Sequence, residues 1–182
     1  MPDIRNAKTD EAVKGAMLAL LQKKPLSEIG MAELARQAGV SRSTLYVHYG
    51  NVHDVFQALV ADFVVSVRSL PTQLRCDGCE MARGKRPFCI ALREAGEYEP
   101  LVKTAEFLPT YLDLLLSGLM LEEALAPYLS TGVTVDQARA LFVFQMTGCY
   151  TAATTLNDAR WKDSQRIIDQ FIRGGFNALR NA

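Results

Sequence analysis

Three cysteines lie close together in the middle of the chain, with the spacing C-x2-C-x9-C at Cys76, Cys79 and Cys89. Two thiolates separated by two residues can bind one tetrahedral ion, because a tight turn brings both sulfur atoms to a suitable distance. The third cysteine strengthens this pattern, and the sequence therefore indicates a candidate zinc site. A fourth ligand is not obvious from the order of the residues.

The same cysteines allow two other interpretations. Cys89 follows Pro87 at the expected start of a helix, where the positive end of the helix dipole favours a reactive thiolate. The segment could then serve as a redox or thiol-reactive sensor. The third interpretation is that the cysteines are inert residues of a loop. The sequence alone leaves the three open.

A second group of chemically active side chains lies in residues 41–48, which read SRSTLYVH. Ser41 is a good N-cap for a short helix in which Leu45 and Tyr49 lie one turn apart, and Val40 and Leu45 would fill the junction with the preceding helix. The other side chains are left free to face a nucleic-acid groove or its phosphates: Arg42, Ser43, Thr44, Val47 and His48. Exposed hydroxyl and imidazole groups suit phosphate contacts.

The residues before this segment supply the rest of a helix-turn-helix. A short helical pattern runs from Met31 to Gly39, and glycine tolerates the left-handed turn conformation that the motif needs. Ala35, four residues earlier, is small enough for a close helix crossing. The alternative is that residues 31–56 form only a three-helix core fragment, since this spacing also arises by chance.

The segment LARQAGVSRSTLYVHYGN also resembles the signature of the tetracycline-repressor (TetR) family of transcriptional regulators, over about the first 65 residues. The resemblance implies a repressor that binds a double-stranded DNA operator as a homodimer. It places Arg42, Ser43 and Thr44 at the major groove, and Tyr46 and His48 at the phosphates. The expected DNA-binding residues are Ser41, Arg42, Ser43, Thr44, Tyr46 and His48.

Two positions depart from the usual pattern of that family. Gly30 stands where a threonine commonly caps the second helix, and Val52 stands where a lysine commonly lies near the start of the fourth. The missing lysine removes a phosphate contact, and His53 is the neighbouring residue that could take its place. Residues 1–70 also carry eight Lys or Arg against seven Asp or Glu. We therefore expect the DNA-binding segment to have little net positive charge.

Apolar residues spaced three and four apart predict helices over most of the chain, and no strand-like alternation persists, so the expected fold is all-α. We expect residues 1–50 to form a helix-turn-helix DNA-binding domain and residues 51–182 to form a larger ligand-binding and dimerisation domain. Within it, residues 51–70 form a connecting helix and residues 71–88 a cysteine-containing loop. The other expected helices cover residues 4–24, 88–95, 104–129 (with Pro109 as a break or a first-turn residue), 135–157 and 164–179.

The C-terminal half has two expected roles. By the resemblance, its last two helices pair with those of a second copy in a four-helix bundle, and Gly148, Ala152 and Ala153 are small enough for that approach. Residues 101–150 are rich in large apolar side chains that could line a pocket for an unknown small-molecule effector. Its expected lining residues are Tyr111, Met146, Thr147 and Tyr150, although such stripes more often form plain core.

The remaining features of the sequence limit which classes of function we expect. Charges at the N-terminus exclude a secretory signal, and no apolar run is long enough to span a membrane, so we expect a cytoplasmic protein. No catalytic constellation or phosphate-binding glycine loop can be identified, and both histidines lie in the expected DNA-binding segment, so an enzyme is not expected. The alternatives to a ligand-responsive regulator are a helical adaptor that has lost DNA binding and a small metal-binding protein that uses the cysteine loop.

Overall fold

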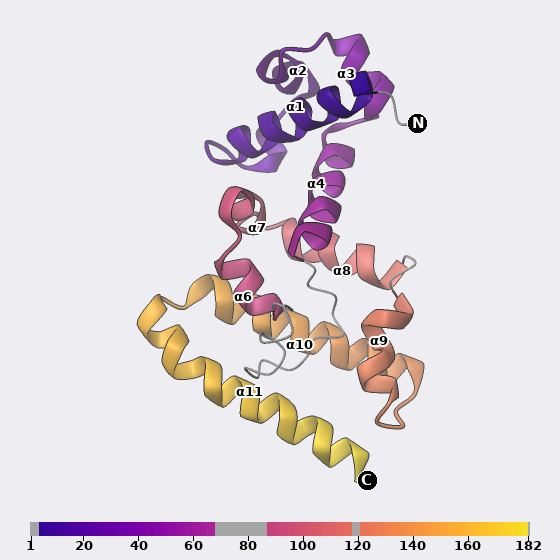
Figure 1. Ribbon diagram of the computed structural model, residues 1–182, viewed down its shortest axis with the longest axis vertical. Coiled ribbons are helices and arrows are strands. Elements are labelled where there is room, and N and C mark those ends of the chain that lie inside the picture. The colour runs from indigo at the N-terminus through magenta and orange to yellow at the C-terminus, as the bar shows by residue number, and fades with distance from the viewer. Residues whose placement is uncertain (1–3, 68–86, 118–120, 182) are drawn as a thin grey trace. The chain divides into compact units, whose positions relative to one another are not determined.

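The computed structural model describes residues 4–67, 87–117 and 121–181, and every regular element in these ranges is a helix (Figure 1). The predicted all-α fold is confirmed. The chain divides into two compact units. The first combines Met1–Phe63 with Gly96–Thr110, and the second combines Val64–Ala95 with Tyr111–Ala182.

The first unit contains α1 (Ile4–Leu21), a 3-10 turn η1 (Leu26–Glu28), α2 (Met31–Ala38), α3 (Arg42–His48) and most of α4 (Val52–Val67). It also holds η2 (Gly96–Tyr98), α7 (Glu99–Val102) and the start of α8 (Phe107–Ser117). Apolar side chains of the first four α-helices are buried together and form its core. They include Val13, Met17, Leu34, Leu45, Val55, Phe56 and Leu59.

Phe63 of α4 packs η2 and the start of α8 against this core. Its ring meets Tyr98 and Phe107 edge-on, with centroid separations of 5.7 and 5.4 Å. Such aromatic pairs add to the free energy gained by burial alone. The short elements η2 and α7 were not predicted from the sequence, because four-residue helices have too few turns to show a hydrophobic period.

The second unit contains α6 (Phe88–Arg93), the rest of α8, α9 (Leu121–Leu129), α10 (Val135–Thr155) and α11 (Asp158–Arg180). Phe88 stacks on Tyr111 at 4.7 Å, and Tyr128 meets Phe142 edge-on at 6.2 Å. Pro109 lies in the first turn of α8, where a proline is tolerated. The predicted run 104–129 corresponds to α8 and α9 in the described residues.

Helix α11 begins at Asp158, six residues before the predicted start at Ser164. The side chain of Asn157 caps it by accepting a hydrogen bond from the Arg160 amide at 3.0 Å. Asparagine is a preferred N-cap, so this start had a sequence signal that the apolar pattern obscured. Only Leu156 and Asn157 separate α10 from α11, and the chain turns there in a sharp corner (Figure 1).

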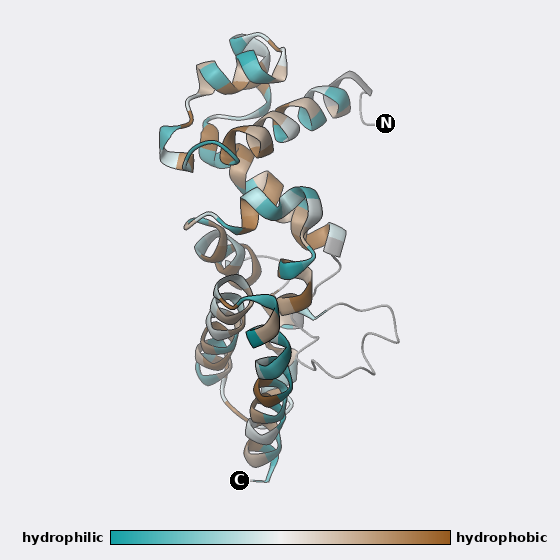
Figure 2. Ribbon diagram, turned by 90° about the vertical axis from the view of Figure 1, so that its left-hand side faces the viewer, coloured by the Kyte–Doolittle hydropathy of each residue, from teal (hydrophilic) through white to brown (hydrophobic). Residues whose placement is uncertain are grey.

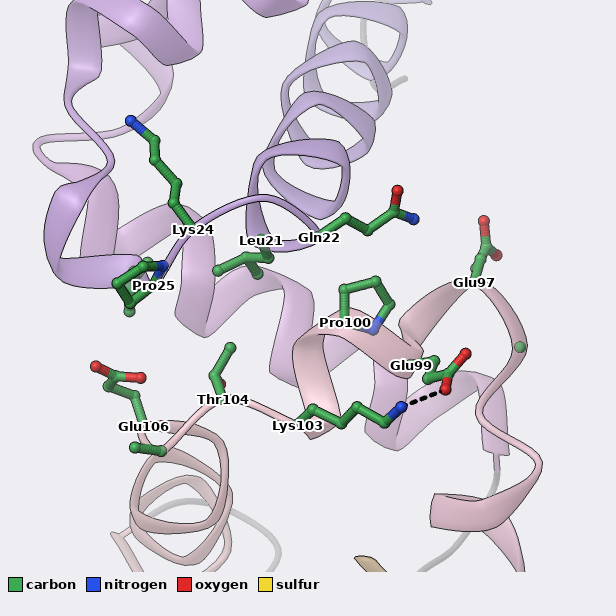
Figure 3. A pocket seen from close by; sticks show the side chains of 13 residues that line it. Leu21, Gln22, Lys24, Pro25, Glu97, Glu99, Pro100, Lys103, Thr104 and Glu106 are labelled. Carbon is green, nitrogen blue, oxygen red and sulfur yellow. Dashed lines mark hydrogen bonds and ion pairs between the residues drawn. The ribbon is translucent and has the colours of Figure 1, made fainter.

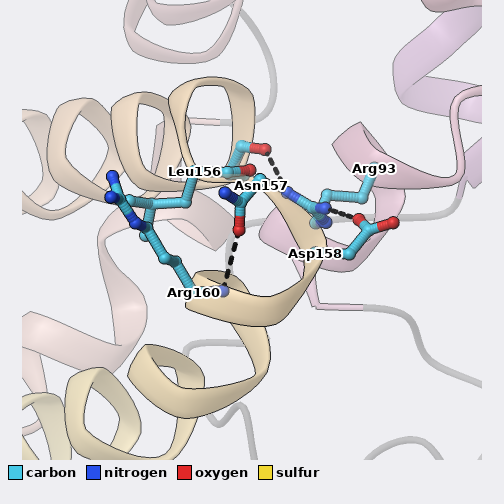
Figure 4. Close-up of polar contacts among 6 residues, drawn as sticks. Arg93, Leu156, Asn157, Asp158 and Arg160 are labelled. Carbon is cyan, nitrogen blue, oxygen red and sulfur yellow. Dashed lines mark hydrogen bonds and ion pairs between the residues drawn. The ribbon is translucent and has the colours of Figure 1, made fainter.

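Arg93 of α6 holds this corner, as Figure 4 shows. Its Nη1 donates to the carbonyl oxygens of Ala153 and Leu156 at 2.9 Å each, and its Nη2 pairs with Asp158. Its guanidinium also lies 5.3 Å from the ring centroid of Trp161. One side chain therefore satisfies carbonyls left unpaired at the end of α10 and meets the first turn of α11.

Hydropathy along the C-terminal helix follows an amphipathic pattern, with hydrophilic and hydrophobic residues interleaved (Figure 2). In the described ranges, no helix is both long and apolar enough to cross a membrane. The predicted boundary at residue 50 stays a prediction about domain function. The first compact unit reaches further, because α4 contributes its buried face as far as Phe63.

Candidate nucleic-acid interface

The turn between α2 and α3 depends on Gly39. This residue adopts φ 68° and ψ 27°, the left-handed conformation expected from the sequence, and its amide donates to the carbonyls of Ala35 and Arg36. The Val40 amide also donates to the Ala35 carbonyl, at 3.0 Å. These bonds end α2 and redirect the chain into α3, which gives the two short helices of a helix-turn-helix.

Ser41 begins α3 as predicted. Its Oγ accepts a hydrogen bond from the Thr44 amide at 3.0 Å and lies 2.8 Å from the hydroxyls of both Ser43 and Thr44. Three hydroxyl groups are thus clustered at the start of the helix, and the cap fixes its direction.

The two faces of α3 differ sharply in burial. Leu45 is fully buried and Tyr49, just after the helix, is 9% exposed. On the opposite face, Tyr46 is 56% exposed and Val47 is 83% exposed. The structure brings all the predicted DNA-binding residues onto this one short helix and its cap. Ser41, Arg42, Ser43 and Tyr46 are exposed, and Thr44 and His48 are partly exposed.

A charged network that was not predicted from the sequence contacts the C-terminal end of α3. The Tyr49 hydroxyl donates to Asp10 of α1, and the Lys14 ammonium lies 2.7 Å from carboxylate oxygens of both Asp10 and Asp62 of α4. The (i, i+4) spacing of Asp10 and Lys14 was the one local signal for it. The network links α1, α4 and the end of α3.

The protonation of this network follows from its contacts. Burial alone would raise the pKa of Asp10, but Lys14 and the Tyr49 hydroxyl outweigh it and lower that pKa. Burial likewise opposes the charge on Lys14, yet the two carboxylates raise its pKa. Burial and the bond to Asp10 both raise the pKa of Tyr49. Asp10 and Lys14 are therefore charged, and Tyr49 is neutral, at neutral pH.

The start of α4 is fixed by reciprocal bonds. The Asp54 amide donates to Asn51 Oδ1 at 3.0 Å, while Asp54 Oδ2 accepts from the amides of Gly50 and Asn51 at 2.8 and 3.1 Å. Asn51 is therefore the N-cap of α4. Beside it, His53 is exposed and its ring stacks on Phe56, with a centroid separation of 6.1 Å.

The candidate zinc site lies largely outside the described residues, since these include neither Cys76 nor Cys79. Cys89 lies in the first turn of α6 and is only 3% exposed, and Cys149 is 9% exposed. Within the described ranges, no three His, Cys, Asp or Glu side chains are grouped so as to hold a metal ion. The burial of Cys89 leaves its thiol little access to solvent oxidants.

The four expected effector residues occupy different environments. Tyr111 and Met146 are buried in the core of the second unit, and Tyr150 is half-buried, with a pKa raised by burial. Thr147 is exposed and lines an apolar groove between α10 and α11, which none of the other three lines. The effector pocket stays a prediction.

A separate cavity of about 580 Å³ lies within the first unit, between the end of α1 and the segment 96–106 (Figure 3). Leu21, Pro25 and Pro100 give it an apolar part. Lys103 and Glu99 form an ion pair at 2.5 Å along one side of it. None of the expected effector residues lines this cavity.

A capped, outward-facing helix that follows a glycine-mediated turn is the arrangement of a helix-turn-helix. Residues 16–59 match the family described as "Bacterial regulatory proteins, tetR family". This segment covers α2, α3 and the turn between them. Residues 16–59 therefore form a helix-turn-helix of the TetR type of bacterial regulatory proteins, as the sequence predicted.

Among solved structures, the chain is similar to the TetR family repressor AlkX from Dietzia sp. strain DQ12-45-1b, a protein implicated in the biodegradation of n-alkanes. The sequences are 22% identical, the TM-score is 0.44, and the alignment covers 95% of this chain and 96% of that one. No curated protein matches the chain significantly.

Proposed function

We propose that the chain is a homodimeric repressor that binds a pseudo-palindromic operator and is released by a small-molecule, metal or redox signal. The single observation that carries this proposal is the outward face of α3. Its side chains are exposed, while its cap, Tyr49 and the Asp10–Lys14–Asp62 network hold the helix rigidly from behind. Groups held in place before binding lose less entropy on contact with DNA.

The dimer is supported by an apolar groove of about 670 Å³ between α10 and α11, here called the α10–α11 groove. None of its lining residues is charged. Two of them, Phe144 and Phe171, are 69% and 70% exposed, and Gly148 and Gly175 leave room for close helix approach. Such a contiguous exposed apolar surface is unusual for a monomer.

A second copy is the occupant that this groove fits best. Both walls are helices of similar length and apolar character, so the same surface can meet itself across a two-fold axis. Two copies would pack α10 and α11 as a four-helix bundle. The dimer would then carry two α3 helices to half-sites about one turn of DNA apart.

The signal would act through the second unit. Helix α4 contributes residues to both compact units, up to Phe63 in the first and from Val64 in the second. A ligand that binds one arrangement of α4 more tightly than another would shift the population of DNA-competent dimers.

A footprint on the DNA flanking the protein's own gene tests this proposal. We expect two protected half-sites related by inverted symmetry, with centres about 10 base pairs apart or slightly more. One isolated protected site would contradict the dimeric operator complex. No protection at low salt, with folded protein, would favour the adaptor or the metal-binding alternative.

A further inference from the structure

Val47 is the most exposed large apolar side chain of the described residues, at 83%. An α-helix turns about 100° per residue, so Val47 lies almost directly opposite the midpoint between Leu45 and Tyr49. Those two side chains are buried and fix the inner side of α3. Val47 therefore marks the centre of the outward face, and any groove that receives α3 meets it first.

The residues around Val47 indicate which kind of partner this surface can bind. Ser43, one turn earlier, and Arg42 are exposed and polar, and Tyr46 carries a hydroxyl. An isolated branched apolar group inside a polar surface does not form the extended apolar core of a protein interface. Such a side chain instead fits a partner whose surface is polar but carries one small apolar group.

The major groove of DNA offers such a projection. Thymine carries a 5-methyl group there, whereas the other bases present hydrogen-bond donors and acceptors. Valine cannot hydrogen-bond, and its two methyl groups can pack against that methyl. We propose that Val47 contacts the 5-methyl group of a thymine in each half-site and so selects thymine at that position.

This inference rests on the proposed DNA-binding function and adds a base preference to it. Arg42 and Ser43 then have the complementary role, because they can hydrogen-bond to base edges or phosphates beside the thymine. The preference would come from a single methyl contact, and a hydrogen-bonding residue at position 47 would lose it.

The test uses a duplex selected by the full-length protein from a randomised pool. Each thymine in the selected site is replaced in turn by deoxyuridine, which removes only the methyl group. At one position per half-site we expect affinity to fall about fourfold, the effect of one methyl-sized apolar contact. Replacing the same thymine with 5-methylcytosine, paired with guanine, should retain more affinity than unmodified cytosine does.

The decisive comparison is with the variant Val47→Ala. Its fold should be unchanged, since the side chain is exposed and alanine favours helices. The thymine-to-deoxyuridine penalty at that position should disappear in this variant, while the matched variant Val65→Ala, at another exposed valine, should keep it. A penalty that persists in Val47→Ala would overturn the thymine contact and leave DNA binding intact.

Other outcomes also bear directly on the proposal. If the protein enriches no duplex from the pool, the proposed DNA-binding function fails and the thymine contact fails with it. If DNA binding is normal in Val47→Ala and the variant instead loses a protein partner, the exposed valine serves that partner, and the base preference is wrong.

Discussion

The ammonium nitrogen of Lys14 on α1 lies 2.7 Å from a carboxylate oxygen of Asp62 on α4. The same nitrogen is 2.7 Å from Asp10, which in turn accepts a hydrogen bond from Tyr49 at the end of α3. One cation thus connects the end of α3, through Asp10 and Tyr49, to α4. The position of α3 depends on this network as well as on the apolar core.

Replacing Lys14 with methionine should lower the free energy of unfolding by about 1 kcal/mol, because two partly exposed carboxylates lose their shared cation. Chemical denaturation with urea measures this loss. The matched variant Lys8→Met, on an exposed part of the same helix, should change stability by less than about 0.5 kcal/mol. Asp62→Asn should cost less in the Lys14→Met background than alone, and equal costs would show that the two residues do not interact.

The network also predicts a dependence on pH. The pKa of Asp10 is lowered on folding, so its contribution is present above its ordinary value of 3.8 and is lost as the pH falls through the lowered value. The pKa of Lys14 is raised, so its contribution is present below 10.5 and is lost as the pH rises through the raised value. Wild-type protein and Asp10→Asn should therefore differ in unfolding free energy near pH 7 and converge near pH 2. A difference that stays constant over that range would contradict this assignment.

Gly39 should resist substitution for conformational reasons. A β-carbon at this position meets no atom within 4 Å, so Gly39→Ala tests the left-handed backbone alone and should destabilise the protein by about 1 kcal/mol. Gly15→Ala, also without a nearby atom but inside α1, should instead stabilise by about 0.5–1 kcal/mol. Thermal unfolding of both variants measures the contrast, and a shift of the same sign in both would be inconsistent with strain at residue 39.

The proposed dimer can be broken at the α10–α11 groove. Phe171→Glu places a charge in an uncharged apolar surface, and its burial in an interface would be unfavourable. Sedimentation should show a dimer for the wild-type protein and a monomer for this variant at micromolar concentration. Val65→Glu, at an exposed valine that does not line the groove, should remain dimeric. A dimeric Phe171→Glu would place the interface elsewhere.

Arg93 should be important for the corner between α10 and α11. Arg93→Met removes two hydrogen bonds to carbonyls and the pairing with Asp158, so we expect a loss of about 2–3 kcal/mol. Arg160→Met, close to the same corner, should cost far less. Urea denaturation followed by the fluorescence of Trp161, which lies under Arg93, reports on this region directly. Equal losses in the two variants would indicate that Arg93 does not hold the corner.

The local features of the reader could be predicted from the sequence, because each depends on a few neighbouring residues. Gly39 in its turn, Ser41 as a cap and the burial of Leu45 are of this kind. The bond between Asp10 and Tyr49 joins residues 39 positions apart, and no local pattern reveals such a pairing.

The second unit was harder to predict for a related reason. Its helices are apolar on more than one side, so the sequence did not separate core, dimer surface and pocket. Thr147, expected in an effector pocket, lines the outer α10–α11 groove, while Tyr111 is fully buried against Phe88. Burial depends on which helices pack together, and that is decided by contacts distant in sequence.

The most direct test of DNA reading by α3 is a salt series of binding to duplex DNA flanking the protein's own gene. We expect the logarithm of affinity to fall linearly with the logarithm of salt concentration, as phosphate contacts require. The double variant Arg42→Ala, His48→Ala should bind more weakly at every salt concentration, with a slope smaller by about one to two. Absence of binding at low salt, or identical affinity and slope in the double variant, would contradict the assignment of α3 as the recognition helix.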